Sequence, residues 1–145
     1  MKLPVYVSIE EVQRVCAELG IRDWTKLSEP KVEMAEAEVV LREVNSGGMP
    51  IVVEDFAAGL EVELEHGLRF PDANVTNNHP VLTGMIVMAH FKESLDYYQR
   101  LDVAELEGDL LKALAAGDLA KAKAKYLKLT QAKKALSEIE ARLLG

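Results

Sequence analysis

The helical character of this chain is clearest in residues 8–20, which read SIEEVQRVCAELG. Ser8 and Glu11 have the spacing of a capping box, in which side chains satisfy the free backbone N–H groups at the start of a helix. The apolar residues that follow recur every three or four positions, and Gly20 stands where a helix commonly ends. The stretch therefore predicts one amphipathic helix with a single core-facing side.

The same start and stop signals predict further helices over residues 30–44, 51–67, 80–101, 103–116 and 119–143. The last two are joined at a glycine and keep apolar spacings of three and four, the pattern of two helices that pack side by side. We therefore expect an all-α fold. A compact bundle of about four helices occupies residues 1–101, and a C-terminal antiparallel helical hairpin occupies residues 102–145, either packed on the body or used for association.

Composition excludes several classes of protein. The formal net charge of -7 argues against nucleic acid as a partner, because phosphate binding is driven by clustered Lys and Arg. No apolar run approaches the roughly 20 residues that cross a bilayer, and the first residues do not have the pattern of a secretory signal. The lone Cys16 fits a reducing compartment. We expect a soluble, cytoplasmic protein with neither a nucleic-acid nor a membrane partner.

Charge is distributed unevenly between the two predicted parts. Residues 1–101 carry 17 acidic and 9 basic side chains, a balance of -8, whereas residues 102–145 carry 7 acidic and 8 basic, a balance of +1. A lysine-rich helix face exposed to solvent would explain the positive balance of residues 102–145. The alanine-rich, lysine-flanked seam of the tail also favours an interaction element, so a homo-oligomer or a protein partner bound through the C-terminal hairpin is the expected association.

Two histidines lie three residues from a glutamate within predicted helices. Glu63 precedes His66, and His90 precedes Glu93; residues three apart share a helix face, so each helix can present an imidazole and a carboxylate in one direction. These ligands suit zinc or iron. The four residues are therefore candidate metal ligands, and a second metal would need further carboxylates, for which the candidates are Glu36, Glu38 and Asp96.

Two other interpretations of these residues stay open. A His bonded to Glu or Tyr inside a bundle also forms a satisfied structural network without any ligand, and a metal-free acid/base site is a third possibility. His66 ends its helix, so it could instead face Asp72, Thr76 and His79 in the Asn-rich connector, which is predicted to be an ordered loop. The function is accordingly either metal binding or a non-enzymatic helical interaction or oligomerisation module.

The common catalytic motifs are missing from the sequence. It has no phosphate-binding loop, no dinucleotide fingerprint, no Gly-x-Ser-x-Gly elbow, no Cys-x-x-Cys pair and no His-Glu-x-x-His zinc-protease helix. No catalytic residue can be assigned, and whether the protein is an enzyme stays open.

Four stretches carry a family resemblance: residues 60–67, 74–77, 83–84 and 89–101. They contain ELEHG, TG and AH-x-x-E-x-x-DYY-x-x-L, and they resemble a family of small microbial and phage-associated helical domains of unknown function. The resemblance covers about residues 53–101 well and the first helix loosely. It implies a compact helical domain and brings no activity, cofactor or partner. The family's pattern falls on Glu63, Glu65, His66, Thr76, Thr83, His90, Glu93, Tyr97 and Tyr98, and Leu95 departs from it where a proline is usual.

Overall fold

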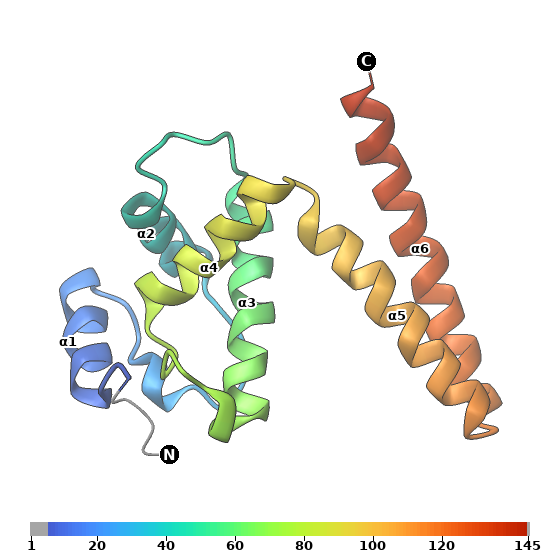
Figure 1. Cartoon of the computed structure of the whole chain (residues 1–145), viewed down its shortest axis with the longest axis horizontal. Helices are drawn as coiled ribbons and strands as arrows, with labels where there is room; N and C mark the ends of the chain where they lie inside the picture. The colour runs from blue at the N-terminus through green and yellow to red at the C-terminus, as the bar shows by residue number, and fades with distance from the viewer. Residues whose placement is uncertain (1–5, 145) are drawn as a thin grey trace. The chain divides into compact units, whose positions relative to one another are not determined.

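The computed structural model describes residues 6–144, apart from the side chain of residue 143. Over these residues the chain is helical and has no strand, which confirms the all-α prediction. None of the described helices combines the length and the apolar character needed to cross a membrane. The α-helices are α1 (Ile9–Leu19), α2 (Met34–Val44), α3 (Val53–Arg69), α4 (Pro80–Glu93), α5 (Tyr97–Ala115) and α6 (Leu119–Leu143), with short 3-10 helices η1 (Trp24–Lys26) and η2 (Pro71–Ala73) (Figure 1).

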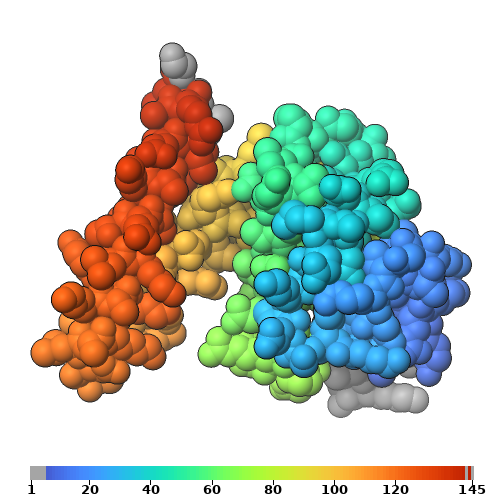
Figure 2. All heavy atoms as spheres, turned by 180° about the vertical axis from the view of Figure 1, so that it is seen from behind, coloured from blue at the N-terminus to red at the C-terminus, as the bar shows by residue number. Residues whose placement is uncertain are grey.

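The chain forms two compact units, Met1–Glu93 and Ser94–Gly145. In the N-terminal unit, α2, α3 and α4 pack against one another in all three pairings, and α1 contacts η1 and α4. In a space-filling view, the described atoms of this unit form one continuous body (Figure 2). The side chains that fill its core are less than 2 % exposed and come from its four α-helices and from η1: Val12, Cys16, Trp24, Val40, Phe56, Leu60, Leu64 and Val87.

Helix α1 has the predicted ends, with one difference in its cap. Ser8 accepts a hydrogen bond from the backbone N–H of Glu11 at 3.2 Å, and Gly20 ends the helix with φ +68°. The Glu11 carboxylate turns instead to Arg14, with hydrogen bonds of 2.6 and 2.8 Å. The complete capping box belongs to α2, where the side chains of Glu33 and Glu36 each accept from the other's backbone N–H.

Helix α4 ends at Glu93, so the prediction that it continues to Leu101 is wrong. Ser94 donates its hydroxyl hydrogen bond to Asp96, and the backbone N–H of Tyr97 bonds to the Ser94 carbonyl at 3.1 Å. These local bonds close a turn, because Ser and Asp side chains compete with the helix for backbone groups. A new helix then starts at Tyr97, so the predicted hairpin is right only in part: its first helix begins before residue 102.

The C-terminal unit consists of α5 and α6, which pack side by side and antiparallel (Figure 1). Gly117 makes the reversal with φ +69°, a backbone conformation that costs glycine little, and Asp118 caps α6 by accepting from the Lys121 N–H at 2.9 Å. The seam between the helices consists of small and branched side chains that are at most 8 % exposed: Leu106, Ala113, Ala122 and Leu129.

Candidate functional site

Glu63 and His90 are the two predicted ligands that the fold brings into contact. Glu63 lies on α3 and His90 on the facing helix α4, and Glu63 Oε1 is 3.5 Å from His90 Nε2. Their side chains are 16 % and 28 % exposed, so the contact is largely shielded from water. The pair therefore bridges two helices, whereas the sequence pattern paired each histidine with a glutamate of its own helix.

The other two predicted ligands do not complete a metal site. His66 lies three residues after Glu63, at the end of α3, and Glu93 is exposed at the last position of α4. Within residues 6–144, no group of three or more His, Cys, Asp or Glu side chains is placed to hold a metal ion. The geometry therefore gives no support to a zinc or iron centre built from Glu63, His66, His90 and Glu93.

Two of the carboxylates considered for a second metal are buried but bind arginine. Glu36 is 5 % exposed and accepts two hydrogen bonds from the Arg22 guanidinium, at 2.6 and 2.9 Å. Burial raises the pKa of the Glu36 carboxyl, but the hydrogen bonds from Arg22 and from backbone N–H groups outweigh it and leave the pKa below its ordinary value. In the C-terminal unit, Asp96 is 2 % exposed and binds Arg100 at 2.7 and 3.0 Å. Both carboxylates serve structural ion pairs.

A small pocket opens where α3 ends and α4 begins, and we call it the His66 pocket. Its volume is ≈ 140 Å³. Thr83, on α4, lines it and is only 2 % exposed. Polar side chains that lie far apart in the sequence thus meet at one hollow of the N-terminal unit. Its lining consists of Glu63, His66, Gly67, Ala73, Asn74, Val75, Thr76, Thr83 and Ile86.

One wall of the His66 pocket is a loop held by asparagines. Asn74 donates its side-chain amide to Asn78 Oδ1 at 2.9 Å and to the Gly67 carbonyl at 3.3 Å. A Cβ atom at Gly67 would lie 2.6 Å from Asn78 Oδ1, so a larger residue here would displace the bonded asparagine side chains. Thr76 Oγ1 accepts from the Asn78 N–H at 3.2 Å. These bonds confirm the prediction of an ordered loop and fix its position on the end of α3.

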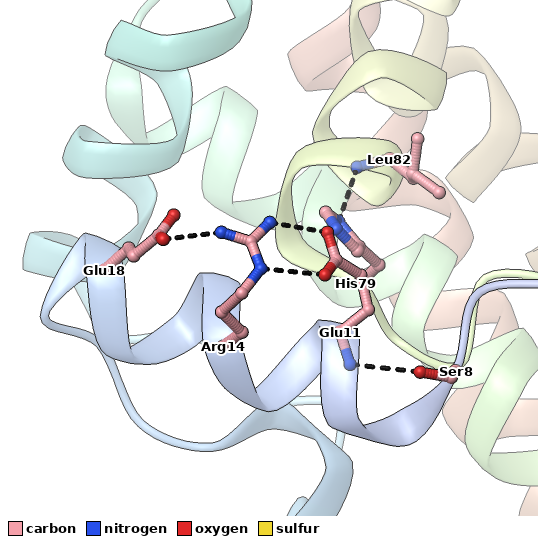
Figure 3. A network of polar contacts seen from close by, with 6 residues as sticks. All are labelled: Ser8, Glu11, Arg14, Glu18, His79 and Leu82. Carbon is pink, nitrogen blue, oxygen red and sulfur yellow. Dashed lines mark hydrogen bonds and ion pairs between the residues drawn. The ribbon is translucent and has the colours of Figure 1, made fainter.

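Of the loop residues that His66 was predicted to face, only Thr76 lines the His66 pocket. His79 has a different role, since its Nδ1 accepts the backbone N–H of Leu82 at 3.3 Å at the start of α4 (Figure 3). An imidazole nitrogen that accepts this bond is unprotonated, so the ring proton is on Nε2. Burial lowers the pKa of His79, while Glu11 raises it and Arg14 lowers it; the net direction is downward.

The lowered pKa of His79 makes stability depend on pH. In acid the unfolded chain takes up the proton more readily than the folded protein, so the free energy of unfolding falls as the pH drops below about 6.5, toward the folded pKa. His79→Asn should keep the cap and remove this loss, because Asn is a good N-cap that does not titrate. Urea unfolding at about pH 7.5 and 5.5 measures it: wild type should lose more stability than the variant. Equal losses would contradict the role assigned to His79.

Two long-range contacts of the N-terminal unit had no specific sequence signal. The ion pair of Arg22 with Glu36 spans 14 positions, and the contact of Asn78 with the Trp24 carbonyl, at 3.4 Å, spans 54. Helical periodicity reports only which residues share a face, so it cannot find such contacts. The density of Asn between residues 74 and 78 was the one usable indication that this loop is fixed.

The comparisons with known proteins give a family and no activity. A family model described as "Protein of unknown function (DUF5661)" matches residues 12–107, which covers most of α1, all of α2 to α4 and the first half of α5. Neither a curated protein nor a solved structure matches the chain. The family match confirms the expectation of a domain of unknown function.

Proposed function

We propose, on the premise that the chain belongs to this family of unknown function, that it is a non-enzymatic helical interaction module whose C-terminal unit binds a second copy of itself. The observation that carries the proposal is a group of exposed apolar side chains near the turn between α5 and α6. We call this group the apolar flank. It consists of Leu111, Leu114, Leu119 and Tyr126, which are 68, 52, 74 and 57 % exposed.

Ion pairs identify the side of the hairpin on which this flank lies. Glu107 of α5 and Lys133 of α6 are joined at 2.7 Å, so both lie on the same side of the seam. Leu114 follows Glu107 by seven residues, and Tyr126 precedes Lys133 by seven. Because residues seven apart share a helix face, Leu114 and Tyr126 also lie on that side, nearer to the turn.

The opposite side of the hairpin is polar. Asp109 lies two residues beyond Glu107, about 200° around the helix, and binds Lys125 of α6 at 2.6 Å. A shallow groove of ≈ 520 Å³ runs along this side. Its polar lining consists of Asp102, Glu105, Asp109, Lys125, Lys128 and Gln131. The apolar flank and this largely polar groove therefore lie on opposite sides of the hairpin.

A second copy of the chain is the occupant that the charges favour. Two copies that met through residues 1–101 would repel each other, because each of these parts has a net charge of -8. Residues 102–145 have a net charge of only +1. The charged pair on the apolar side, Glu107 with Lys133, is neutral, so the same surface can face itself in a two-fold dimer. Two such hairpins would form four packed helices, an arrangement that buries apolar side chains that two helices leave exposed.

Sedimentation of the full chain tests this association. We expect wild type to shift from monomer to dimer between about 5 and 500 μM, and Tyr126→Glu to weaken dimerisation at least tenfold, because a charge would be desolvated in the interface. Glu is a good helix former, so α6 should remain folded, which circular dichroism can check.

Leu127→Glu is the matched control. Leu127 is 54 % exposed and adjacent to Tyr126, but it lies two residues from the buried Leu129, roughly on the opposite side of α6. This variant should dimerise like wild type. A wild-type protein that stays monomeric over the whole range, or equal weakening by both substitutions, would refute the proposed interface.

Within this proposal, the Glu63–His90 contact has a structural role and holds α3 against α4. A shielded carboxylate and imidazole stabilise each other and fix how the two helices face. A structural role for these residues is the alternative to a metal site that the sequence left open. Two observations support it: the 3.5 Å contact, and the absence among residues 6–144 of a third side chain placed to complete a metal site.

A further inference from the structure

The groove on the polar side of the C-terminal unit has an acidic edge and a basic edge, and we call it the charged groove. Asp102, Glu105 and Asp109 line it from α5. They follow one another at intervals of three and four residues, so they share one face of that helix. Lys125 and Lys128 line it from α6. The two helices therefore present opposite charges on the two sides of one hollow.

The pair of Asp109 with Lys125, at 2.6 Å, joins the two edges near the bend of the hairpin. Glu105 precedes Asp109 by four residues, and Lys128 follows Lys125 by three. Because α5 and α6 are antiparallel, Glu105 and Lys128 both lie about one turn farther from the bend, at the same level on opposite edges. Both side chains are exposed, and neither forms an ion pair within residues 6–144. Water alone solvates these two charges in a single copy.

A two-fold axis along the charged groove would bring opposite charges of two copies together. Rotation about an axis parallel to the helices keeps each residue at its level and exchanges the two edges. Glu105 of each copy then faces Lys128 of the other, so two equal ion pairs form. An axis perpendicular to the helices would instead place acidic edge against acidic edge and lysine against lysine, which is unfavourable. The charges thus select one of the two symmetric arrangements.

The apolar part of the lining is compatible with such a contact. It consists of Leu106, which is 8 % exposed, and of Ala132 and Ala135. The distance between packed helices depends on the side chains at the contact, and alanines allow a close approach. In the selected arrangement each helix lies between two antiparallel neighbours, as in up-and-down four-helix bundles.

We propose that the charged groove is a second self-association surface, in which two copies pack about a two-fold axis parallel to α5 and α6. Glu105 of each copy binds Lys128 of the other. The groove lies opposite the apolar flank, so use of both surfaces would link dimers into longer assemblies. Exposed ion pairs contribute little, so the groove should associate more weakly than the flank, with a dissociation constant of about 1 mM.

Charge reversal on the full chain tests this contact separately from the flank. Every chain carries Tyr126→Glu, so the outcome does not depend on association through the flank. Sedimentation equilibrium at about 0.1 to 2 mM protein and about 150 mM salt measures the dimer; this salt screens charges farther apart than about 8 Å. We expect the Tyr126→Glu parent to dimerise, and Glu105→Lys or Lys128→Glu each to weaken dimerisation at least tenfold, because like charges then meet twice. The double variant should regain the affinity of the parent.

A mixture and a matched control complete the test. Equal amounts of the Glu105→Lys and Lys128→Glu chains should associate when mixed, because each ion pair is then again one of opposite charges. Lys134→Glu has the same net charge as Lys128→Glu but lies outside the groove lining, so it should dimerise like the parent. A parent that stays monomeric to about 2 mM, a double variant as weak as the single ones, or equal weakening by Lys134→Glu and Lys128→Glu would overturn the proposal. If a single variant fails to fold, the double variant still decides.

Discussion

Arg22→Met is expected to lower the free energy of unfolding by about 2 kcal/mol, because it leaves the buried Glu36 carboxylate without its counter-ion. The guanidinium binds both carboxylate oxygens, at 2.6 and 2.9 Å. The backbone N–H groups of residues 22 and 33 still bond Glu36, each at 3.0 Å, and the Arg22 side chain is 45 % exposed. These two facts keep the expected loss below that for a fully enclosed pair.

Arg14→Met is the matched control for Arg22→Met. Arg14 also binds carboxylates, those of Glu11 and Glu18, through three nitrogens, but all three side chains lie on the exposed face of α1 (Figure 3). Exposed ion pairs contribute little, so this substitution should leave the urea midpoint unchanged. Equal losses in the two variants would show that burial of Glu36 is not the cause.

The effect of Arg22→Met should also depend on pH. Glu36 has a folded pKa below its ordinary value near 4.5, so its ion pair stabilises the protein above that pH. As the pH falls through the folded pKa, the carboxyl becomes protonated and the attraction to Arg22 disappears. The stability difference between wild type and variant should therefore shrink in acid, whereas a purely steric effect would persist.

The sequence predicts helices well where local bonds decide their ends. Helix α1 begins after Ser8 and ends before Gly20, as predicted. Both ends are set by neighbouring residues, the first by a side-chain cap and the second by a left-handed turn. The prediction fails at the end of α4, where apolar spacing continues through Leu101 but the side chains of Ser94 and Asp96 close a turn. The periodicity of apolar residues persists across such a break, because the helices on both sides of it each keep an apolar face.

The candidate site was predictable in part for the same reason. The sequence placed Glu63, His66 and His90 on or beside core-facing helix surfaces; Glu63 and His90 are half-buried on α3 and α4, whereas His66 is exposed in the last turn of α3. Which of them meet depends on how α3 and α4 cross, and spacing along one helix carries no information about that.

Gly84→Ala is expected to lower the free energy of unfolding by about 2 kcal/mol, because it overpacks the contact between α2 and α4. A Cβ atom at position 84 would lie 2.8 Å from Val40 Cγ1, 3.2 Å from Val44 Cγ1 and 3.4 Å from the ring of Phe56. Val40 is 0 % exposed and β-branched, so its methyl group cannot rotate away without a clash elsewhere. The helices would have to separate, which outweighs the gain of about 1 kcal/mol from replacing glycine within a helix.

Gly108→Ala isolates that intrinsic gain. Gly108 lies inside α5, and a Cβ atom there would meet nothing within 4 Å, so this variant should be more stable than wild type by about 0.5 to 1 kcal/mol. Urea unfolding of both variants should give opposite signs. Stabilisation by Gly84→Ala would mean that α2 and α4 can move apart at no cost, and the close packing of these helices would then not be what holds the N-terminal unit together. Opposite signs of the two stability changes would instead show that α4 requires glycine at the position where α2 crosses it. The close contact of α2 with α4 then also holds in place the start of α4 and Thr83, which lines the His66 pocket.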